Sequence, residues 1–147
     1  PSISGLPAFL VKNGGLNSGF MIVQYTAAAL VSENKVLAHP ASVDSIPSSG
    51  NQEDHVSMGT IAARKAGEIL ENLRRVIGME LMCACQAIDL QNGGDKLGVG
   101  TRAAYEAVRR VCDRLEEDRP LYEDINRCEA LLRDGILLDA VRGACAN

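Results

Sequence analysis

Five consecutive polar side chains between Asn51 and His55 form the densest group of chemically capable residues in the sequence. They read N-Q-E-D-H and stand between a proline-containing loop and a long helical pattern. We expect that helix to begin near Glu53, which would place Glu53 and Asp54 at its positive end, where negative charge is favoured. Both carboxylates would stay ionised there and could orient a cationic group or accept a proton. Plain helix capping is the alternative, since acidic residues are common in a first helical turn for the same electrostatic reason.

The sequence contains two histidines, His39 and His55. Two are too few for a histidine-rich metal site, and no spacing of serine, histidine and aspartate indicates a catalytic triad. Either histidine could be a structural residue, and for His55 we favour orientation of the loop over a direct catalytic role. We therefore predict no metal site.

The five cysteines lie mostly within apolar helical patterns, and none forms a C-x-x-C pair; they are Cys83, Cys85, Cys112, Cys128 and Cys145. An odd number of cysteines without such a pair fits a reducing cytoplasm better than a disulfide framework. We predict that these side chains belong to the core and are neither metal ligands nor redox groups.

The composition favours helices. Aromatic residues make up 3% of the chain, and the 46% hydrophobic content is mainly aliphatic, which suits close-packed helices better than aromatic-rich strands. We predict an all-α fold with long central helices packed in a bundle and shorter C-terminal helices. A net charge of −4 without a basic stripe argues against nucleic acid as a partner. With no run of about 18 apolar residues and no basic-then-apolar leader, we expect neither a membrane span nor an export signal.

The first predicted helix covers residues 18–35. Its sequence is apolar almost all round, which is typical of a helix that is enclosed on most sides and central to an assembly. Asn17 or Ser18 is its expected N-cap. The chain begins at Pro1 without an initiator Met, so we expect it to be a piece of a longer protein.

A loop rich in serine and proline follows at residues 38–50. Ser49 and Gln52 at its end have the spacing of a capping box, and Asn51 is a second cap candidate. Apolar residues at intervals of three and four then predict a helix over residues 53–90. Such a helix would be about 55 Å long, which exceeds the diameter of a compact domain of this size. We therefore expect it to project into partner subunits.

Glu80 interrupts the apolar stripe of this long helix, because Ile77 and Ala84 on either side both belong to the stripe. A buried carboxylate needs a cationic or hydrogen-bonding partner. We predict an ion pair with an arginine of a neighbouring helix, and a catalytic role is the alternative.

Four glycines interrupt the sequence at residues 92–100. The stretch lacks a G-K-[S/T] sequence and a preceding strand, so we predict a mobile surface loop instead of a phosphate-binding loop. Three shorter helices should follow, over residues 101–117 with Thr101 as the cap, over residues 118–134, and from Gly135 to about Cys145.

Several blocks of sequence occur in the order found in one enzyme family. They are G-L-P-A-F-L at 5–10, G-G-L-N-S-G-F-M-I at 14–22, S-E-N-K at 32–35, A-H-P-A-S-V-D-S at 38–45, N-Q-E-D-H-V-S-M at 51–58 and C-Q-A-I-D-L at 85–90. Together they resemble the histidine ammonia-lyases of the aromatic amino acid lyase family. The resemblance is dense from residue 5 to about residue 90 and thin afterwards. Linked blocks in order are far more specific than a single motif.

The resemblance implies the C-terminal portion of an enzyme of histidine degradation that removes ammonia from L-histidine to give trans-urocanate. The family's electrophile is a methylidene-imidazolone (MIO), which forms by cyclisation of an Ala-Ser-Gly tripeptide. This sequence lacks that tripeptide, so the resemblance implies that the chain alone is inactive.

The resemblance also implies a catalytic role for Glu53, because phenylalanine-specific relatives carry glutamine at the matching position. A carboxylate can pair with an imidazole or an ammonium, whereas a phenyl ring would leave its charge uncompensated. Gln52, His55 and Asn51 flank this position, and we expect them to bind substrate or to support Glu53.

Family members are similar in being homotetramers whose active sites combine several subunits, and we expect the same assembly in the cytoplasm. Residues 1–90 would supply central helices and the active-site loop, and residues 91–147 would supply peripheral C-terminal helices. Two alternatives stay open: a non-catalytic helical oligomerisation module, or a related lyase or aminomutase for another aromatic amino acid. The acidic Glu53 disfavours the second alternative.

Overall fold

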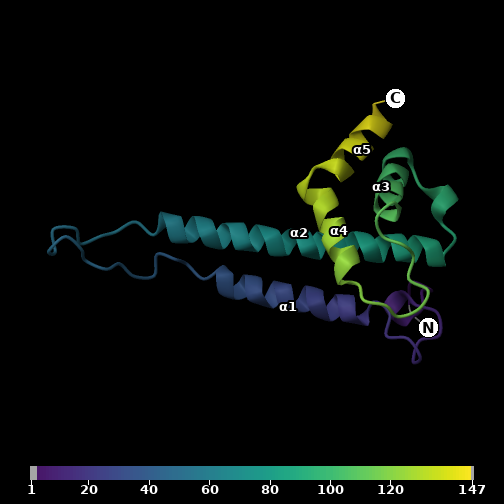
Figure 1. The fold of residues 1–147 in the computed structure, drawn as a ribbon, viewed down its shortest axis with the longest axis horizontal. Helices are drawn as coiled ribbons and strands as arrows, with labels where there is room; N and C mark the ends of the chain where they lie inside the picture. Colours follow the sequence, from purple (N-terminus) through teal and green to yellow (C-terminus); the bar gives the residue numbers. More distant parts are fainter. Residues whose placement is uncertain (1–2, 147) are drawn as a thin grey trace.

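Two antiparallel helices form the long axis of the structure (Figure 1). In this computed structural model, which describes residues 3–146, helix α1 spans Met21–Leu37 and helix α2 spans Gly59–Leu90. The 32 residues of α2 correspond to about 48 Å at 1.5 Å per residue. Helix α2 is the long helix that the apolar spacing predicted, although it begins six residues later than residue 53.

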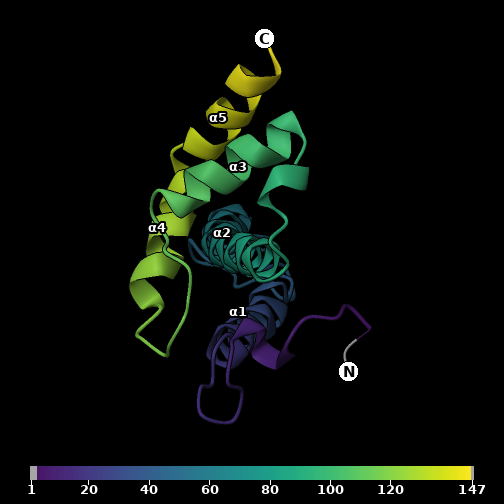
Figure 2. The same ribbon diagram turned by 90° about the vertical axis from the view of Figure 1, so that its right-hand side faces the viewer.

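Three shorter helices lie on the side of α2 opposite to α1, as an end-on view shows (Figure 2). They are α3 (Val99–Arg109), α4 (Tyr122–Arg133) and α5 (Ile136–Cys145). The first two pack against α2, and the third packs against the other two. Residues 3–146 contain no β-strand, and only two isolated β-bridges occur among them. The predicted all-α class, with long central helices and shorter C-terminal ones, is confirmed.

The hydrophobic core forms where α2 meets the shorter helices. Met79 and Met82 of α2 are almost completely buried and cluster with Val108 of α3 and Cys128 of α4. Gly78 lets α2 and α4 approach closely. A Cβ atom at Gly78 would lie 3.2 Å from a backbone nitrogen of α4 and 3.4 Å from the Cβ atom of Cys128. The core therefore depends on a small residue at this crossing.

Gln86 is a buried polar residue within this core, with 1% of its surface exposed. Its Nε2 donates to the carbonyl oxygens of Leu10 at 2.9 Å and Leu115 at 2.8 Å. Its Oε1 accepts from the backbone N–H of Leu115 at 3.1 Å. One side chain of α2 thus holds both the N-terminal segment and the linker between α3 and α4.

Asp118 forms a second tie between these segments, and the prediction that a helix starts there is wrong. Its carboxylate accepts hydrogen bonds from the backbone N–H groups of Ser18 at 2.7 Å and Gly19 at 2.8 Å. These two bonds lower the pKa of Asp118 because they stabilise its charged form, and the bond from Ser18 has the larger effect. Helix α4 begins only at Tyr122.

Two other predicted helix starts also shift. Helix α1 begins at Met21, and neither Asn17 nor Ser18 caps it with a side chain; the amide of Ser18 is bonded to Asp118 instead. Helix α3 begins at Val99, so Thr101 lies inside it and does not cap it.

The end of α3 at Arg109 is earlier than predicted. The backbone after it is held by Gln86 through Leu115, and these bonds replace those of a continuing helix. The predicted separation of the last two helices at Gly135 is confirmed, since this glycine has a φ of 74° in the left-handed region that ends helices.

The paired helices are joined by buried and partly buried polar contacts. Asn72 of α2 is 6% exposed, and its Nδ2 donates to Glu33 Oε2 and Asn34 Oδ1 of α1, both at 3.0 Å. Nearer the end of α1, Lys65 Nζ donates to the carbonyl oxygen of His39. These contacts define how far α1 and α2 are offset along their axes.

The outer faces of both helices remain uncovered by this chain. Val23 is the only buried residue of α1, and the apolar side chains of Ile22, Tyr25 and Val36 are 55%, 69% and 74% exposed. The prediction that α1 is enclosed on most sides therefore does not hold within this chain. None of the described helices combines the length and the apolar character needed to cross a membrane.

The predicted burial of Glu80 does not hold within this chain. Glu80 is exposed together with Ile77 and Ala84, and it forms no ion pair with an arginine of residues 3–146. The face of α2 that enters the core is a neighbouring one, which carries Met79 and Met82. Helix α2 has two apolar faces, and spacing alone does not distinguish the buried face from the exposed one.

Candidate functional site

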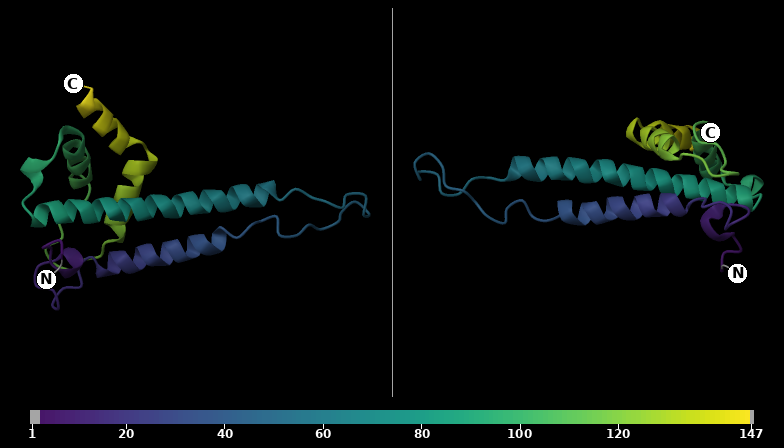
Figure 3. Two further views of the ribbon diagram at one scale, coloured as in Figure 1. Left: turned by 180° about the vertical axis from the view of Figure 1, so that it is seen from behind. Right: turned by 60° about the horizontal axis from the view of Figure 1, so that its bottom comes forward.

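Residues 38–58 connect α1 to α2 and extend beyond the ends of both helices, away from α3, α4 and α5 (Figure 3). We call this segment the connecting loop. The loop has two arms, one that follows α1 and one that precedes α2. Lys65 Nζ of α2 donates to the carbonyl oxygen of His39, at the start of the first arm. Further out, Ser45 Oγ accepts a hydrogen bond from the backbone N–H of Val56 at 2.8 Å, which joins the two arms.

Glu53 lies near the tip of the connecting loop, and the prediction that it starts the long helix is wrong. Helix α2 begins at Gly59. Ser48 and Glu53 form an isolated antiparallel bridge, with Ser48 N donating to Glu53 O at 2.8 Å and Glu53 N donating to Ser48 O at 3.3 Å. This pairing holds Glu53 in an extended arm, so its carboxylate does not lie at the positive end of a helix.

A tight turn links the two bridged residues. Ser49, Gly50 and Asn51 have φ values of 53°, 63° and 65°, a left-handed conformation that glycine and asparagine adopt most readily. The backbone N–H of Gln52 donates to the carbonyl oxygen of Ser49 at 3.3 Å. The spacing of Ser49 and Gln52 therefore marks a turn at the loop tip and not a capping box.

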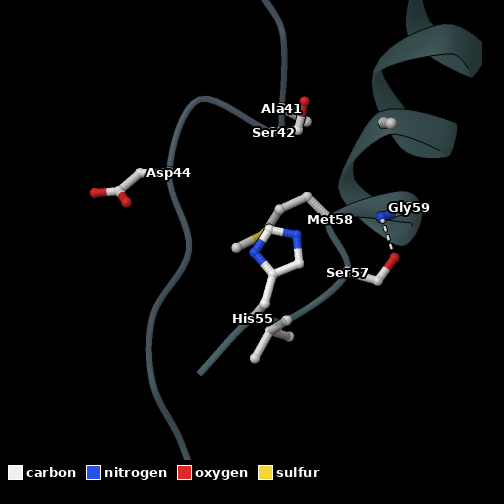
Figure 4. Close-up of a pocket in the computed structure, with 9 residues that line it drawn as sticks. Ala41, Ser42, Asp44, His55, Ser57, Met58 and Gly59 are labelled. Carbon is white, nitrogen blue, oxygen red and sulfur yellow. Dashed lines mark hydrogen bonds between the residues drawn. The ribbon is translucent and has the colours of Figure 1, made fainter. Parts of the chain in front are cut away.

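His55 lies closer to α2 and lines a cavity of about 450 Å³ between the two arms (Figure 4). The other lining residues are Ala41, Ser42, Asp44, Val56, Ser57, Met58, Gly59 and Ala62. The imidazole lies beside Met58, whereas the carboxylate of Asp44 points away from it. Asp44 Oδ1 instead accepts from the backbone N–H of Ser45 at 2.7 Å.

The N-Q-E-D-H residues therefore share the outer part of the loop without converging on one cavity of this chain. All five are exposed. Asn51 and Gln52 occupy the turn, Glu53 pairs with Ser48, and His55 faces the cavity. Such an arrangement presents polar groups to whatever packs against the loop from outside the chain.

Two serines of the connecting loop were missed as functional candidates. Ser48 Oγ donates to Glu53 Oε2 at 3.1 Å, and Ser45 Oγ joins the two arms. In the sequence both belong to a serine-rich stretch that indicates only a loop. Their partners lie five and eleven positions away, and no regular spacing indicates such pairs.

The cysteines contribute no nucleophile to this site. Cys85, Cys112 and Cys128 are buried as predicted, Cys83 is half-buried, and Cys145 is exposed, contrary to prediction. Burial raises the pKa of both Cys83 and Cys85 to about 11, so their thiols stay protonated near neutral pH. Within residues 3–146, no group of three histidine, cysteine or acidic residues is arranged to hold a metal ion.

Known proteins share both the sequence and the fold of this chain. Histidine ammonia-lyase 1 of Fusobacterium nucleatum is 62% identical over 145 residues, which are 98% of this chain and 28% of that protein. The crystal structure of histidine ammonia-lyase from Trypanosoma cruzi matches with a TM-score of 0.86 and 53% identity, over 95% of this chain and 27% of that one. Tyrosine aminomutase from Streptomyces globisporus matches with a TM-score of 0.91 and 42% identity, over the same shares of the two chains.

The chain spans little more than a quarter of the length of these relatives. The family profile described as aromatic amino acid lyase matches residues 1–110, which include α1, the connecting loop and α2. The agreement of profile, relatives and fold establishes that this chain belongs to the aromatic amino acid lyase family.

Proposed function

We propose that this chain is the C-terminal part of a histidine ammonia-lyase, and that the complete enzyme eliminates ammonia from L-histidine to give trans-urocanate. Close relatives named as histidine ammonia-lyases match almost the whole chain, which supports this substrate. In this proposal residues 1–90 supply central helices and an active-site loop, and residues 91–147 supply peripheral helices.

The carboxylate of Glu53 is the observation that carries the proposal. It lies near the tip of a loop that extends beyond this chain's own helices, so it can enter a site formed with other parts of the enzyme. A carboxylate suits an imidazole or ammonium group, because it supplies the opposite charge and accepts hydrogen bonds. Gln52, His55 and Asn51 surround it on the same loop, and we assign them supporting or substrate-binding roles.

The MIO electrophile does not fit the residues of this chain. No Ala-Ser-Gly tripeptide occurs in the sequence, so in this proposal the electrophile belongs to another part of the complete enzyme. The contribution of this chain is then to bind and orient the substrate through Glu53.

We also propose that the complete enzyme is a homotetramer in the cytoplasm. The exposed apolar side chains of Ile22, Tyr25 and Val36 on α1 support burial of this helix against other subunits, since such faces usually mark interfaces. Five cysteines without a disulfide support a reducing compartment. Light scattering on the complete enzyme tests the assembly, and a monomer would refute it.

Two alternatives have support of their own. The exposed helical faces would also suit a non-catalytic oligomerisation module, which predicts assembly without turnover. The similarity to tyrosine aminomutase supports a related enzyme for another aromatic amino acid. Urocanate formation from L-histidine by the complete enzyme would reject both, whereas turnover of tyrosine alone would reject histidine as the substrate.

Replacement of Glu53 by glutamine in the complete enzyme tests the role of the carboxylate. We expect kcat/KM for L-histidine to fall at least about 100-fold, the usual loss when one stabilising group is removed from an active site. Asp54→Asn is the matched control, since it removes the neighbouring exposed carboxylate and should leave most of the activity. Circular dichroism and size-exclusion chromatography check that both variants fold and assemble. An unchanged kcat/KM in Glu53→Gln would refute the proposed role of Glu53.

A further inference from the structure

The Glu53 carboxylate is bonded at one of its two oxygens. Ser48 Oγ donates to Oε2 at 3.1 Å, and no other side chain of residues 3–146 forms a hydrogen bond or ion pair with this carboxylate. Oε1 is therefore available to a ligand. A carboxylate held at one oxygen and open at the other has a defined direction for its second acceptor.

The backbone explains why Ser48 reaches the carboxylate. Ser48 and Glu53 stand directly opposite each other in an antiparallel bridge, and opposite residues of such a pair place their side chains on the same face, with Cβ atoms about 5 Å apart. A hydroxyl one bond beyond one Cβ atom can thus meet a carboxylate that extends from the other.

The turn between the two residues keeps this pair in register. Three consecutive left-handed residues, Ser49, Gly50 and Asn51, reverse the direction of the chain between the two bridge partners. The two backbone hydrogen bonds of the bridge, at 2.8 and 3.3 Å, then fix which residue faces Glu53. A shift by one residue would move the hydroxyl to the opposite face.

We propose that Ser48 is a positioning residue that holds Oε2 of Glu53 so that Oε1 faces the substrate. The inference rests on the proposed function, because it assigns Ser48 a role only through the Glu53 carboxylate. Ser48 itself touches no substrate in this arrangement. Its hydroxyl restricts the rotation of a long, exposed glutamate side chain that would otherwise sample several rotamers.

Two variants of Ser48 in the complete enzyme separate the hydroxyl from the rest of the residue. Ser48→Ala removes the hydrogen bond, and we expect kcat/KM for L-histidine to fall about tenfold, as for the loss of one hydrogen bond to a charged group. Ser48→Thr keeps a hydroxyl at the same carbon and suits an extended backbone, so it should stay within about threefold of the parent. Equal losses in both variants would overturn the proposal.

A double-mutant cycle with Glu53→Ala distinguishes positioning from general support of the loop. Ser48→Ala should cause no further loss in the Glu53→Ala background, because no carboxylate is left to hold. Ser45→Ala is the matched control, since it removes a loop hydrogen bond that does not touch Glu53; its effect should be the same in both backgrounds. Additive losses for Ser48→Ala would overturn the proposal.

The outcomes also separate this inference from the function on which it rests. If Glu53→Ala leaves the turnover of L-histidine unchanged, the proposed role of Glu53 fails and the role of Ser48 fails with it. If Glu53→Ala abolishes most activity while Ser48→Ala matches the parent, only the role of Ser48 is refuted.

Discussion

Replacement of Gln86 by leucine should be among the most damaging single changes in this fold. The side chain is 1% exposed and forms three hydrogen bonds with backbone groups of Leu10 and Leu115. Leucine is similar in size but offers neither a donor nor an acceptor. Gln86→Leu would therefore leave one N–H and two C=O groups without partners where water has little access.

The expected loss in the free energy of unfolding follows from these three groups. A buried polar group that loses its partner costs about 1 to 3 kcal/mol, so the two groups of Leu115 and the partly buried carbonyl of Leu10 together cost about 4 kcal/mol. Burial of an apolar side chain in place of an amide returns about 1 kcal/mol. We expect a net loss of about 3 kcal/mol, which is a large fraction of the 5 to 15 kcal/mol typical of a domain.

Urea denaturation of the 147-residue chain, followed by far-UV circular dichroism, measures this loss. With a slope of about 2 kcal/mol per molar urea, the midpoint should fall by about 1.5 M. Gln91→Leu makes the same chemical change at an exposed position at the end of α2 and should alter stability by no more than about 0.5 kcal/mol.

Hydrogen exchange gives a local readout of the same change, because the amide of Leu115 donates to Gln86 and should lose its protection. If Gln86→Leu were as stable as Gln91→Leu and kept the Leu115 amide protected, the hydrogen bonds of Gln86 would not contribute to the stability of this core.

Two further predictions concern contacts between helices and segments. Gly78→Ala should destabilise the chain by about 1 to 2 kcal/mol, because the new Cβ atom would lie 3.2 Å from a backbone nitrogen of α4. Gly67→Ala is the control on the same helix: no atom lies within 4 Å of its new Cβ atom, so it should stabilise the chain by up to about 1 kcal/mol. Urea denaturation midpoints of the two variants test this difference. Asp118→Asn should lower the urea midpoint more at about pH 6 than at about pH 3. Because the folded-state pKa of Asp118 is below the ordinary 3.8, the stabilisation by its carboxylate is fully present well above 3.8 and is lost as the pH falls through the lowered pKa. A difference between parent and Asp118→Asn that does not change between the two pH values would contradict this sign.

The sequence predicts the helices well because their signals are local. Apolar spacing locates α2, and Gly135 marks the boundary between α4 and α5. Gln86, by contrast, lies within a helical pattern in which nothing distinguishes it from a solvent-exposed glutamine. Its importance depends on Leu10 and Leu115, which are far away along the chain.

The start of α2 illustrates the same limit at the candidate site. Acidic residues that follow a serine-rich loop are typical of a helix start, so the sequence predicts that the helix begins near Glu53. In the structure, the bond between Ser45 and Val56 and the bridge between Ser48 and Glu53 hold this arm against the other one, and the helix begins only at Gly59. The residue type of Glu53 is thus readable from sequence, whereas the direction of its carboxylate is not.

The position of that carboxylate depends on the offset between α1 and α2. Both arms of the connecting loop leave from these helices, and the buried Asn72 fixes their offset by binding Glu33 and Asn34 in a partly buried contact. A slip of one helical turn would move the base of one arm by about 5.4 Å, whereas a catalytic group works within about 0.5 Å of its productive position. An apolar pair at this point would pack in several offsets, but the amide of Asn72 meets its two acceptors in only one. The polar contact inside the helix pair therefore has a consequence at the loop tip, where it determines where Glu53 is presented.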